Sequence, residues 1–336
     1  MKNRSSDLHK AKQNKKDDFY TQLTDIEKEL KYYKNELAGS TIYCNCDDPK
    51  ISNFFHYFSY NFESLKLKKL ITTCYKNKQV DLFSTEKSNS AVFLEYNGDK
   101  NKNKIPDPEE IDVQELEGDG DFRSQESISF LKESDIVVTN PPFSLFREFI
   151  QQLIDYEKKF IVIGSINAIT YKETFRLIKE KKMWLGASIH SGDREFGVPN
   201  DYPLNASGSR VDEHGNKFIS VKGVRWWTNI DYRERHEDLV LFKKFNTNEY
   251  PKYDNYDAIE VKKTKEIPYD YDGVMGVPIT FLDYYNPDQF EVLGMSASAG
   301  YDESIVGIPF LGEKDARPLI DGKNTYARIF IRNKTI

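Results

Sequence analysis

Short apolar runs alternate along the chain with segments in which apolar residues recur at helical spacing. The apolar runs predict strands at residues 41–46, 69–74, 136–139 and 160–164, and a polar hairpin-like excursion through 91–95 follows the second of them. Helical spacing predicts helices at 25–37, from Ser52 or Asn53 to 62, at 125–131 and at 145–154. Because strands alternate with helices, the expected fold is α/β with a doubly wound, mostly parallel sheet.

The strand expected at 136–139 runs directly into Asn140-Pro141-Pro142-Phe143. Proline lacks the N–H that a sheet ladder requires, so the chain must leave the sheet at this point. In an open α/β sheet, the carboxyl ends of the strands form the ligand-binding edge. The motif is therefore expected to face a substrate rather than the core.

The rigidity of this motif indicates its chemistry. Pro141 and Pro142 fix two φ angles, which holds the side-chain oxygen of Asn140 and the Pro141 carbonyl as acceptors on one side. A flat exocyclic amino group offers two N–H donors to these acceptors, and Phe143 can stack on the ring that carries it. All four residues are thus catalytic candidates that would orient an amino nitrogen as a nucleophile. A proline-stopped turn is the alternative for Asn-Pro-Pro alone, but the preceding Ile-Val strand and the aromatic fourth residue favour catalysis.

Asn-Pro-Pro-Phe at a strand end is similar to the catalytic motif of amino-group methyltransferases that use S-adenosylmethionine. Over nearly its full length, the chain resembles the EcoRI-type adenine-specific DNA methyltransferases. The matching segments are DFYTQ at 18–22, YCNCDDP at 43–49, GDGDFRS at 118–124, NPPFSLFRE at 140–148, NAITYKE at 167–173, PKYDNYDAI at 251–259 and GVMGVPITFL at 273–282. The resemblance implies a Rossmann-like methyltransferase sheet with a target-recognition insertion, and double-stranded DNA as the partner.

The resemblance also assigns the cofactor-binding residues. Tyr20 and Thr21, with Phe19 before them, match the family's Phe-Tyr-Thr segment, which packs on S-adenosylmethionine. The remaining assignments are Asp47, Asp48 and Pro49 in the turn after the first strand, Asp121 as an acceptor for the adenine amino group, and Phe122 packing beside it. A turn or helix-cap role is the alternative for each aspartate, but their order before Asn140 favours the cofactor. S-adenosylhomocysteine would be the product, and the reaction requires no metal.

Two features depart from the usual methyltransferase pattern. The turn at 48–53 contains no glycine, so its backbone cannot approach a cofactor in the usual way. The second strand ends at Thr73-Cys74-Tyr75, without the acidic residue that commonly holds the ribose hydroxyls. Both features resemble the EcoRI-type subgroup.

Between Trp184 and Ile230 the alternation gives way to loop-rich sequence, which the resemblance identifies with target recognition. Residues of the types that read base edges occur here, namely Arg194, Asn205, Ser207 and Arg210. Ordinary loop polarity is the alternative for them. Trp226 and Trp227 alternate across a strand expected at 221–227, which predicts that one meets a flipped base and the other the core. The family namesake's target, GAATTC, is an expectation from the resemblance alone.

Composition and charge distribution limit the class of protein. The net charge is −6, but basic residues gather in the first 17 residues and again between 317 and 334, whereas an acidic stretch spans 107–117. This distribution fits a nucleic-acid partner through a flexible basic arm, although a solvated tail is the alternative. No apolar run approaches the ~18 residues of a membrane span, and three cysteines are too few for a disulfide framework. We therefore expect a cytoplasmic protein without a membrane partner. The resemblance implies that it is DNA-associated and of bacterial or phage origin.

The expected organisation is a basic arm at 1–17, a catalytic core at 18–185, a recognition region at 186–260 and a C-terminal region at 261–336 that packs on the core. The predicted reaction extrudes an adenine from the duplex and transfers the methyl group directly to N6, with orientation as the main catalytic term. An RNA adenine, a protein glutamine amide and a non-catalytic DNA-binding role are the alternatives. We expect a monomer, and a cognate restriction endonuclease would act without a stable complex.

Overall fold

The computed structural model describes residues 19–46, 52–73, 91–103, 106, 110–200, 202–204, 208–296, 302–312 and 316–336. The basic arm predicted at 1–17 lies outside the described residues. The chain divides into two compact units, one of 1–165 with 191–230 and one of 166–190 with 231–336. The two units are defined by how the chain packs, whereas the four regions expected from sequence are defined by their functional roles. The division into units does not test these roles, which remain predictions.

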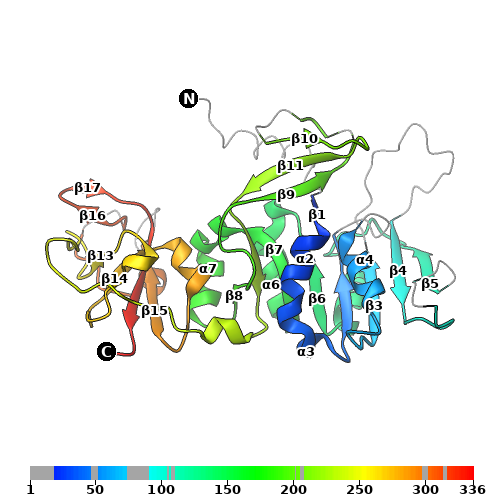
Figure 1. The fold of residues 1–336 in the computed structure, drawn as a ribbon, viewed down its shortest axis with the longest axis horizontal. Coiled ribbons are helices and arrows are strands. Elements are labelled where there is room, and N and C mark those ends of the chain that lie inside the picture. The colour runs from blue at the N-terminus through cyan, green and yellow to red at the C-terminus, as the bar shows by residue number, and fades with distance from the viewer. Residues whose placement is uncertain are drawn as a thin grey trace. The chain divides into compact units, whose positions relative to one another are not determined.

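A large mixed sheet forms the centre of the first unit, with strands in the order β5-β4-β3-β2-β6-β7-β12 (Figure 1). The strands are β2 Thr41–Cys44, β3 Lys69–Thr73, β4 Val92–Tyr96, β5 Ile111–Glu115, β6 Ile136–Thr139, β7 Lys159–Ser165 and β12 Val224–Thr228. β3, β2, β6 and β7 run parallel, and β4, β5 and β12 are each antiparallel to their neighbours. The predicted α/β class with a large sheet is confirmed.

The order of strands reverses beside β2. From β2 the chain continues to β3 on one side, and later places β6 and then β7 on the other side. In α/β sheets, ligands bind at the carboxyl ends of the strands where such a reversal occurs. Here that position lies between β2 and β6, which end at Cys44 and Thr139.

Serine caps and one glycine position the helices of this unit. The helices are α2 Leu23–Leu30, α3 Lys34–Leu37, α4 Asn53–Tyr60, α5 Gln125–Glu133 and α6 Phe146–Asp155, with 3-10 helices at Lys31–Tyr33 and Phe143–Leu145. The hydroxyls of Ser52 and Ser124 accept backbone N–H groups in the first turns of α4 and α5. A Cβ at Gly164 of β7 would collide with the Phe146 ring. Glycine therefore lets α6 begin directly after the Asn-Pro-Pro-Phe corner and lie against the sheet.

A second, antiparallel sheet of the first unit has the order β1-β9-β11-β10 (Figure 1). Its strands are β1 Tyr20–Thr21, β9 Asp193–Val198, β10 Arg210–Val211 and β11 Lys217–Lys222. Tyr20 lies opposite Gly197, so the start of the described chain pairs with the predicted recognition region. The single strand predicted at 221–227 is wrong, because Gly223 has a φ of +68° and separates β11 from β12. We call β1, β9, β11 and β10 the recognition sheet.

The second unit contains a four-stranded sheet of order β13-β14-β18-β15 and a hairpin of β16 and β17 (Figure 1). Its strands are β8 Trp184–Leu185, β13 Ile259–Glu260, β14 Met275–Pro278, β15 Phe290–Met295, β16 Leu319–Ile320, β17 Lys323–Asn324 and β18 Arg328–Asn333. Its helices are α7 Lys172–Lys179 and α8 Glu303–Val306, with 3-10 helices at Ile166–Thr170, Arg233–His236, Thr264–Glu266 and Ile279–Tyr284. Tyr253, Tyr256, Val306 and Phe330 are the large members of a buried cluster beside the sheet.

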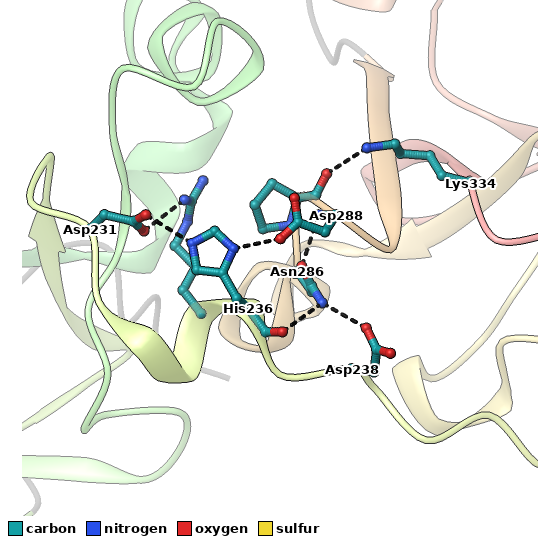
Figure 2. Close-up of polar contacts among 8 residues, drawn as sticks. Asp231, His236, Asp238, Asn286, Asp288 and Lys334 are labelled. Atoms are coloured by element: carbon teal, nitrogen blue, oxygen red, sulfur yellow. Dashed lines mark hydrogen bonds and ion pairs between the residues drawn. The ribbon is translucent and has the colours of Figure 1, made fainter.

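A polar network in the second unit centres on His236 (Figure 2). The Nδ1 atom of His236 lies 2.6 Å from Asp288 Oδ2, and Nε2 lies 2.8 Å from Asp231 Oδ2. Asn286 donates to the His236 carbonyl at 3.2 Å, and Arg235 donates to Asp231 at 3.0 Å. The imidazole thus connects the 3-10 helix that ends at residue 236 to the turn that precedes β15.

We predict that this connection weakens at alkaline pH. Hydrogen bonds to Asp288 and then to Asp231 raise the pKa of His236 above its usual value. Because the folded-state pKa is the higher one, the stabilisation is complete below the unfolded pKa of about 6.5 and is lost as the pH rises through the folded pKa. The difference in melting temperature between the wild type and His236→Gln should therefore shrink as the pH is raised above about 7. A difference that stays constant with pH would contradict the ionic role of the imidazole.

Candidate active site

Asn140 lies buried at the end of β6, at the position where the strand order reverses. Its Nδ2 atom donates to the backbone carbonyl of Phe19 at 2.6 Å, which fixes the orientation of the amide. Its Oδ1 atom is buried and has no hydrogen-bond partner among the described residues. A buried acceptor left without a donor costs roughly 1–3 kcal/mol, so its retention points to a ligand that supplies an N–H group.

A second amide oxygen lies on the other side of the reversal. Asn45 directly follows β2, and its carbonyl accepts a hydrogen bond from the Thr139 hydroxyl. Its own Oδ1 atom is also buried and, within the described part of the chain, has no hydrogen-bond partner. The sequence reasoning missed Asn45, although the residue stands inside the matching segment YCNCDDP and directly before the predicted cofactor turn.

The ring of Phe19 is the centre of an aromatic cluster beside Asn140. Its centroid lies 6.0 Å from that of Phe143, 6.0 Å from that of Phe196 and 6.2 Å from that of Tyr202. Phe19 and Phe196 are buried, whereas Phe143 and Tyr202 are half-buried. The cluster therefore combines the predicted catalytic corner, the predicted cofactor segment and two rings from the region after β8.

The predicted cofactor segment is held in place by β1. Tyr20 and Thr21 form that strand, and Asn53 at the start of α4 donates to the Thr21 carbonyl at 2.6 Å. This bond and the pairing with β9 keep the preceding Phe19 carbonyl against Asn140. Asp47, Asp48 and Pro49 lie outside the described residues.

Asp121 and Phe122 lie before α5, where each already has a packing or ionic partner. Asp121 accepts two hydrogen bonds from the Arg123 guanidinium, at 2.8 and 2.6 Å, and these bonds raise the pKa of Arg123. The Phe122 ring is buried 5.2 Å from that of Phe149, and its carbonyl accepts from Gln152 at 3.1 Å. Phe122 thus anchors this loop to α6, and Asp121 is available to an adenine only through an oxygen that it shares with Arg123.

The two described arginines of the predicted target-reading set lie in the recognition sheet. Arg210 is exposed on β10, where Nε and Nη2 donate to Glu195 at 2.7 and 2.5 Å and the guanidinium lies 4.3 Å from the Phe218 ring. Arg194 is on β9, donates to the Asp193 carbonyl at 2.9 Å and approaches Asp25. Asn205 and Ser207 lie outside the described residues.

Trp226 and Trp227 are both completely buried on β12. Trp226 packs edge-on against Phe54 at 6.2 Å, and Trp227 packs against Phe146 at 5.6 Å. They do alternate across the strand as predicted, but each meets a core ring. Neither indole presents a surface to a base in this structure, so we assign both to the core.

Two features are absent from the described ranges. No group of three His, Cys, Asp or Glu side chains in these ranges could hold a metal ion. No helix in the same ranges is long and apolar enough to cross a membrane.

The described part of the chain thus combines a reversal of strand order, an Asn-Pro-Pro-Phe corner at the end of β6 and a buried amide oxygen without a hydrogen-bond partner there. The family model described as "Adenine-specific methyltransferase EcoRI" matches residues 7–334. The chain therefore belongs to the EcoRI family of adenine-specific methyltransferases. This confirms the family and the enzyme class that the motifs predicted.

Three relatives match the chain over nearly its full length. It is 51% identical to type II methyltransferase M.EcoRI of Escherichia coli, over 98% of this chain and 97% of the relative. It is 39% identical to type II methyltransferase M.MgeORF184P of Mycoplasma genitalium, over 98% and 99% of the two chains. It is 36% identical to type II methyltransferase M.MpnI of Mycoplasma pneumoniae, over 97% and 98%. No solved structure matches the chain.

Proposed function

We propose that this protein methylates N6 of an adenine within a short sequence of double-stranded DNA, with S-adenosylmethionine as the methyl donor. The observation that carries this proposal is the buried Oδ1 atom of Asn140, whose amide is oriented by Phe19 and which has no donor of its own. An exocyclic amino group supplies that donor, and the neighbouring Phe143 ring offers a face for the base.

The sheet is then of the doubly wound, Rossmann-like methyltransferase type, with the cofactor across the carboxyl ends of β2 and β6. The strand reversal between these strands supports this placement. Phe19, Tyr20 and Thr21 on one side and Asp121 with Phe122 on the other are the described residues that would hold the cofactor, and Asp47, Asp48 and Pro49 would complete the site. The unsatisfied Oδ1 atom of Asn45 adds an acceptor for a donor group of the cofactor.

Orientation by Asn140, Pro141 and Phe143 is the main contribution to the rate. An adenine must leave the base stack to reach the corner, which costs a few kcal/mol, and stacking on Phe143 offsets part of this cost. Asn140 Oδ1 and the Pro141 carbonyl then accept the two N6 hydrogens, which directs the nitrogen lone pair away from them. The cofactor, when bound, supplies an activated methyl group for this nitrogen. The displaced product is S-adenosylhomocysteine.

The names of the relatives support the cellular setting that we propose. Each is called a type II methyltransferase, and each comes from a bacterium. We propose a restriction-modification or orphan modification role in the bacterial cytoplasm or in a phage-infected cell. The protein would act as a monomer and without a stable complex with any cognate endonuclease. GAATTC is the proposed target.

The reaction is tested by incubating the purified protein with labelled S-adenosylmethionine and unmethylated duplex DNA. Sequencing that detects N6-methyladenine then locates the label. We expect label at one short motif. Label on RNA or on a protein glutamine, with none on DNA, would refute the proposed substrate.

Arg210 should contribute to sequence discrimination. Glu195 accepts hydrogen bonds from the Nε and Nη2 atoms of Arg210, and Phe218 lies against the guanidinium. The edge of the guanidinium that faces away from Glu195 is therefore held in a fixed orientation. The pair is also neutral as a whole, which favours directional contact with a base edge over simple phosphate attraction. We expect Arg210→Lys to reduce discrimination between the target and singly substituted sites by about 5- to 150-fold. The measurement is kcat/KM on both substrates.

A lysine exposed on the neighbouring strand provides the control for charge. Lys222→Gln removes one positive charge from β11 of the same sheet. It should leave discrimination unchanged. If Arg210 instead contacts phosphate, Arg210→Lys will weaken binding to all sequences alike, and Arg210→Ala will lower the salt dependence of binding by about one ion.

A further inference from the structure

Tyr202 is a half-buried aromatic residue in the connection between β9 and β10, and its ring contacts that of Phe19. We propose that Tyr202 stacks on the extruded adenine from the side opposite Phe143. The proposal rests on the proposed function, because it takes the Asn140 corner as the site of methyl transfer. It assigns a substrate contact to the connection between β9 and β10, which the sequence reasoning did not include.

The rings of Phe143 and Tyr202 share one neighbour, the ring of Phe19. In the proposed arrangement Phe19 is the floor of a slot for the base, and Phe143 and Tyr202 are its two walls. The planes of Phe143 and Tyr202 are inclined to that of Phe19 by 71° and 66°, so both rings stand steeply on the Phe19 ring. Each centroid lies within about 6 Å of the Phe19 centroid, so the separation of the two walls cannot exceed the sum of these distances. Inclinations of this size allow the two rings to face each other with a flat base between them.

Burial distinguishes the floor from the walls. Phe19 is 5% exposed, and its carbonyl holds the Asn140 amide, so its role is to support the site. Phe143 and Tyr202 both keep exposed surface. Of the four rings in the cluster, these two are therefore the ones that a base entering from solvent can contact.

Tyr202 is held in place by its backbone. Its N–H donates to the Pro199 carbonyl at 2.9 Å, which closes a turn directly after β9. Its carbonyl accepts from Lys217 Nζ of β11 at 3.2 Å. Because both partners flank or belong to the recognition sheet, the position of the Tyr202 ring depends on that sheet. Binding of DNA by the recognition sheet therefore affects the position of Tyr202, and through it the position of the extruded base.

Stacking between two rings suits an enzyme that must hold a base outside the helix. An aromatic ring stacks on the face of a base and does not use the hydrogen-bonding groups at the edge of the base. The N6 amino group therefore remains available to Asn140 and Pro141. Trp226 and Trp227 lie in the core and cannot take this role. Phe196 of β9 also contacts the Phe19 ring but is buried, whereas Tyr202 contacts that ring and keeps exposed surface.

The test compares Tyr202→Ala, Tyr202→Phe and the wild type in single-turnover methyl transfer to a duplex with one target site. Loss of one stacking face should lower kcat of Tyr202→Ala by about 5- to 150-fold, whereas Tyr202→Phe retains the ring and should stay near the wild type. An abasic site opposite the target adenine reduces the cost of extrusion, so this substrate should restore most of the lost kcat. The affinity for S-adenosylmethionine should not change.

Tyr60→Ala is the matched control, because Tyr60 lies on α4 and is 61% exposed. It should transfer methyl groups at the wild-type rate. A Tyr202→Ala variant with wild-type kcat, or with a loss that the abasic substrate does not restore, would overturn the proposal. Asn140→Ala in the same assay separates the two claims: if that variant remains active, the proposed site itself is wrong, whereas its inactivity beside an active Tyr202→Ala refutes only the role of Tyr202.

Discussion

Asn140→Ala is expected to lower methyl transfer by about 10²- to 10³-fold or more, while S-adenosylmethionine still binds. Loss of one preorganised hydrogen-bonding group at a reacting centre has an effect of this size. In this protein the amide is fixed by the Phe19 carbonyl, so the orientation of the Oδ1 acceptor does not have to be established during the reaction. The measurements are the single-turnover rate on duplex DNA and the dissociation constant of the cofactor.

The matched control is Asn61→Ala. Asn61 follows α4, and its amide donates to the Tyr57 carbonyl at 2.8 Å, which is a purely local contact. Its replacement should leave the rate unchanged within a small factor. If Asn140→Ala lost cofactor binding together with transfer, Asn140 would belong to the cofactor site and not to the site of the amino group.

Glu260→Ala is expected to have the largest effect on stability, about 3–5 kcal/mol, because it leaves a buried guanidinium without its partner. Glu260 and Arg328 are both buried in the second unit. The Nε and Nη2 atoms of Arg328 donate to the Glu260 carboxylate, and the Tyr253 hydroxyl donates to it as well. Burial lowers the pKa of Arg328, but the hydrogen bonds and charge of Glu260 outweigh burial and raise it. The guanidinium remains charged after Glu260 is removed, because arginine is not deprotonated in proteins. Thermal or urea unfolding of the full chain measures the loss.

The same sheet supplies an exposed counterpart. Arg332 of β18 lies 3.8 Å from Glu291 of β15, with both side chains about half exposed. Glu291→Ala should cost only about 0–1 kcal/mol, since water screens such pairs. Glu260→Leu combined with Arg328→Met should recover much of the loss caused by Glu260→Ala, because no charge is then buried alone. If Glu260→Ala and Glu291→Ala lowered the free energy of unfolding equally, burial would not be what makes the loss of Glu260 costly.

The local pattern was sufficient to predict the strand of the catalytic corner. Ile136–Thr139 is an apolar run, and the two prolines that follow have only one compatible placement at a strand end. The same holds for α4, whose start at Ser52 or Asn53 was predicted from a capping residue before an aromatic run. Both features depend on neighbours within a few residues.

The hydrophobic pattern of the sequence does not predict contacts between residues that are far apart in the chain. The bond from Asn140 to Phe19 joins residues 121 positions apart, and the two residues of β1 carry no periodicity that indicates β9 as their partner. Gly223 divides an apparently continuous strand, because its positive φ is a property of the turn between two sheets. The burial of Trp226 and Trp227 likewise follows from rings on α4 and α6 that cover the two faces of β12.

The central claim is that the target adenine is held at the corner formed by Asn140 and Phe143. Photocrosslinking tests it most directly, with a duplex that carries 5-iodouracil in place of the target adenine and with mass spectrometry to locate the attached residue. The account predicts attachment to Phe143 or Tyr202, and none to the same duplex with 5-iodouracil outside the target. Attachment to Trp226, Trp227 or a residue of the second unit would contradict it.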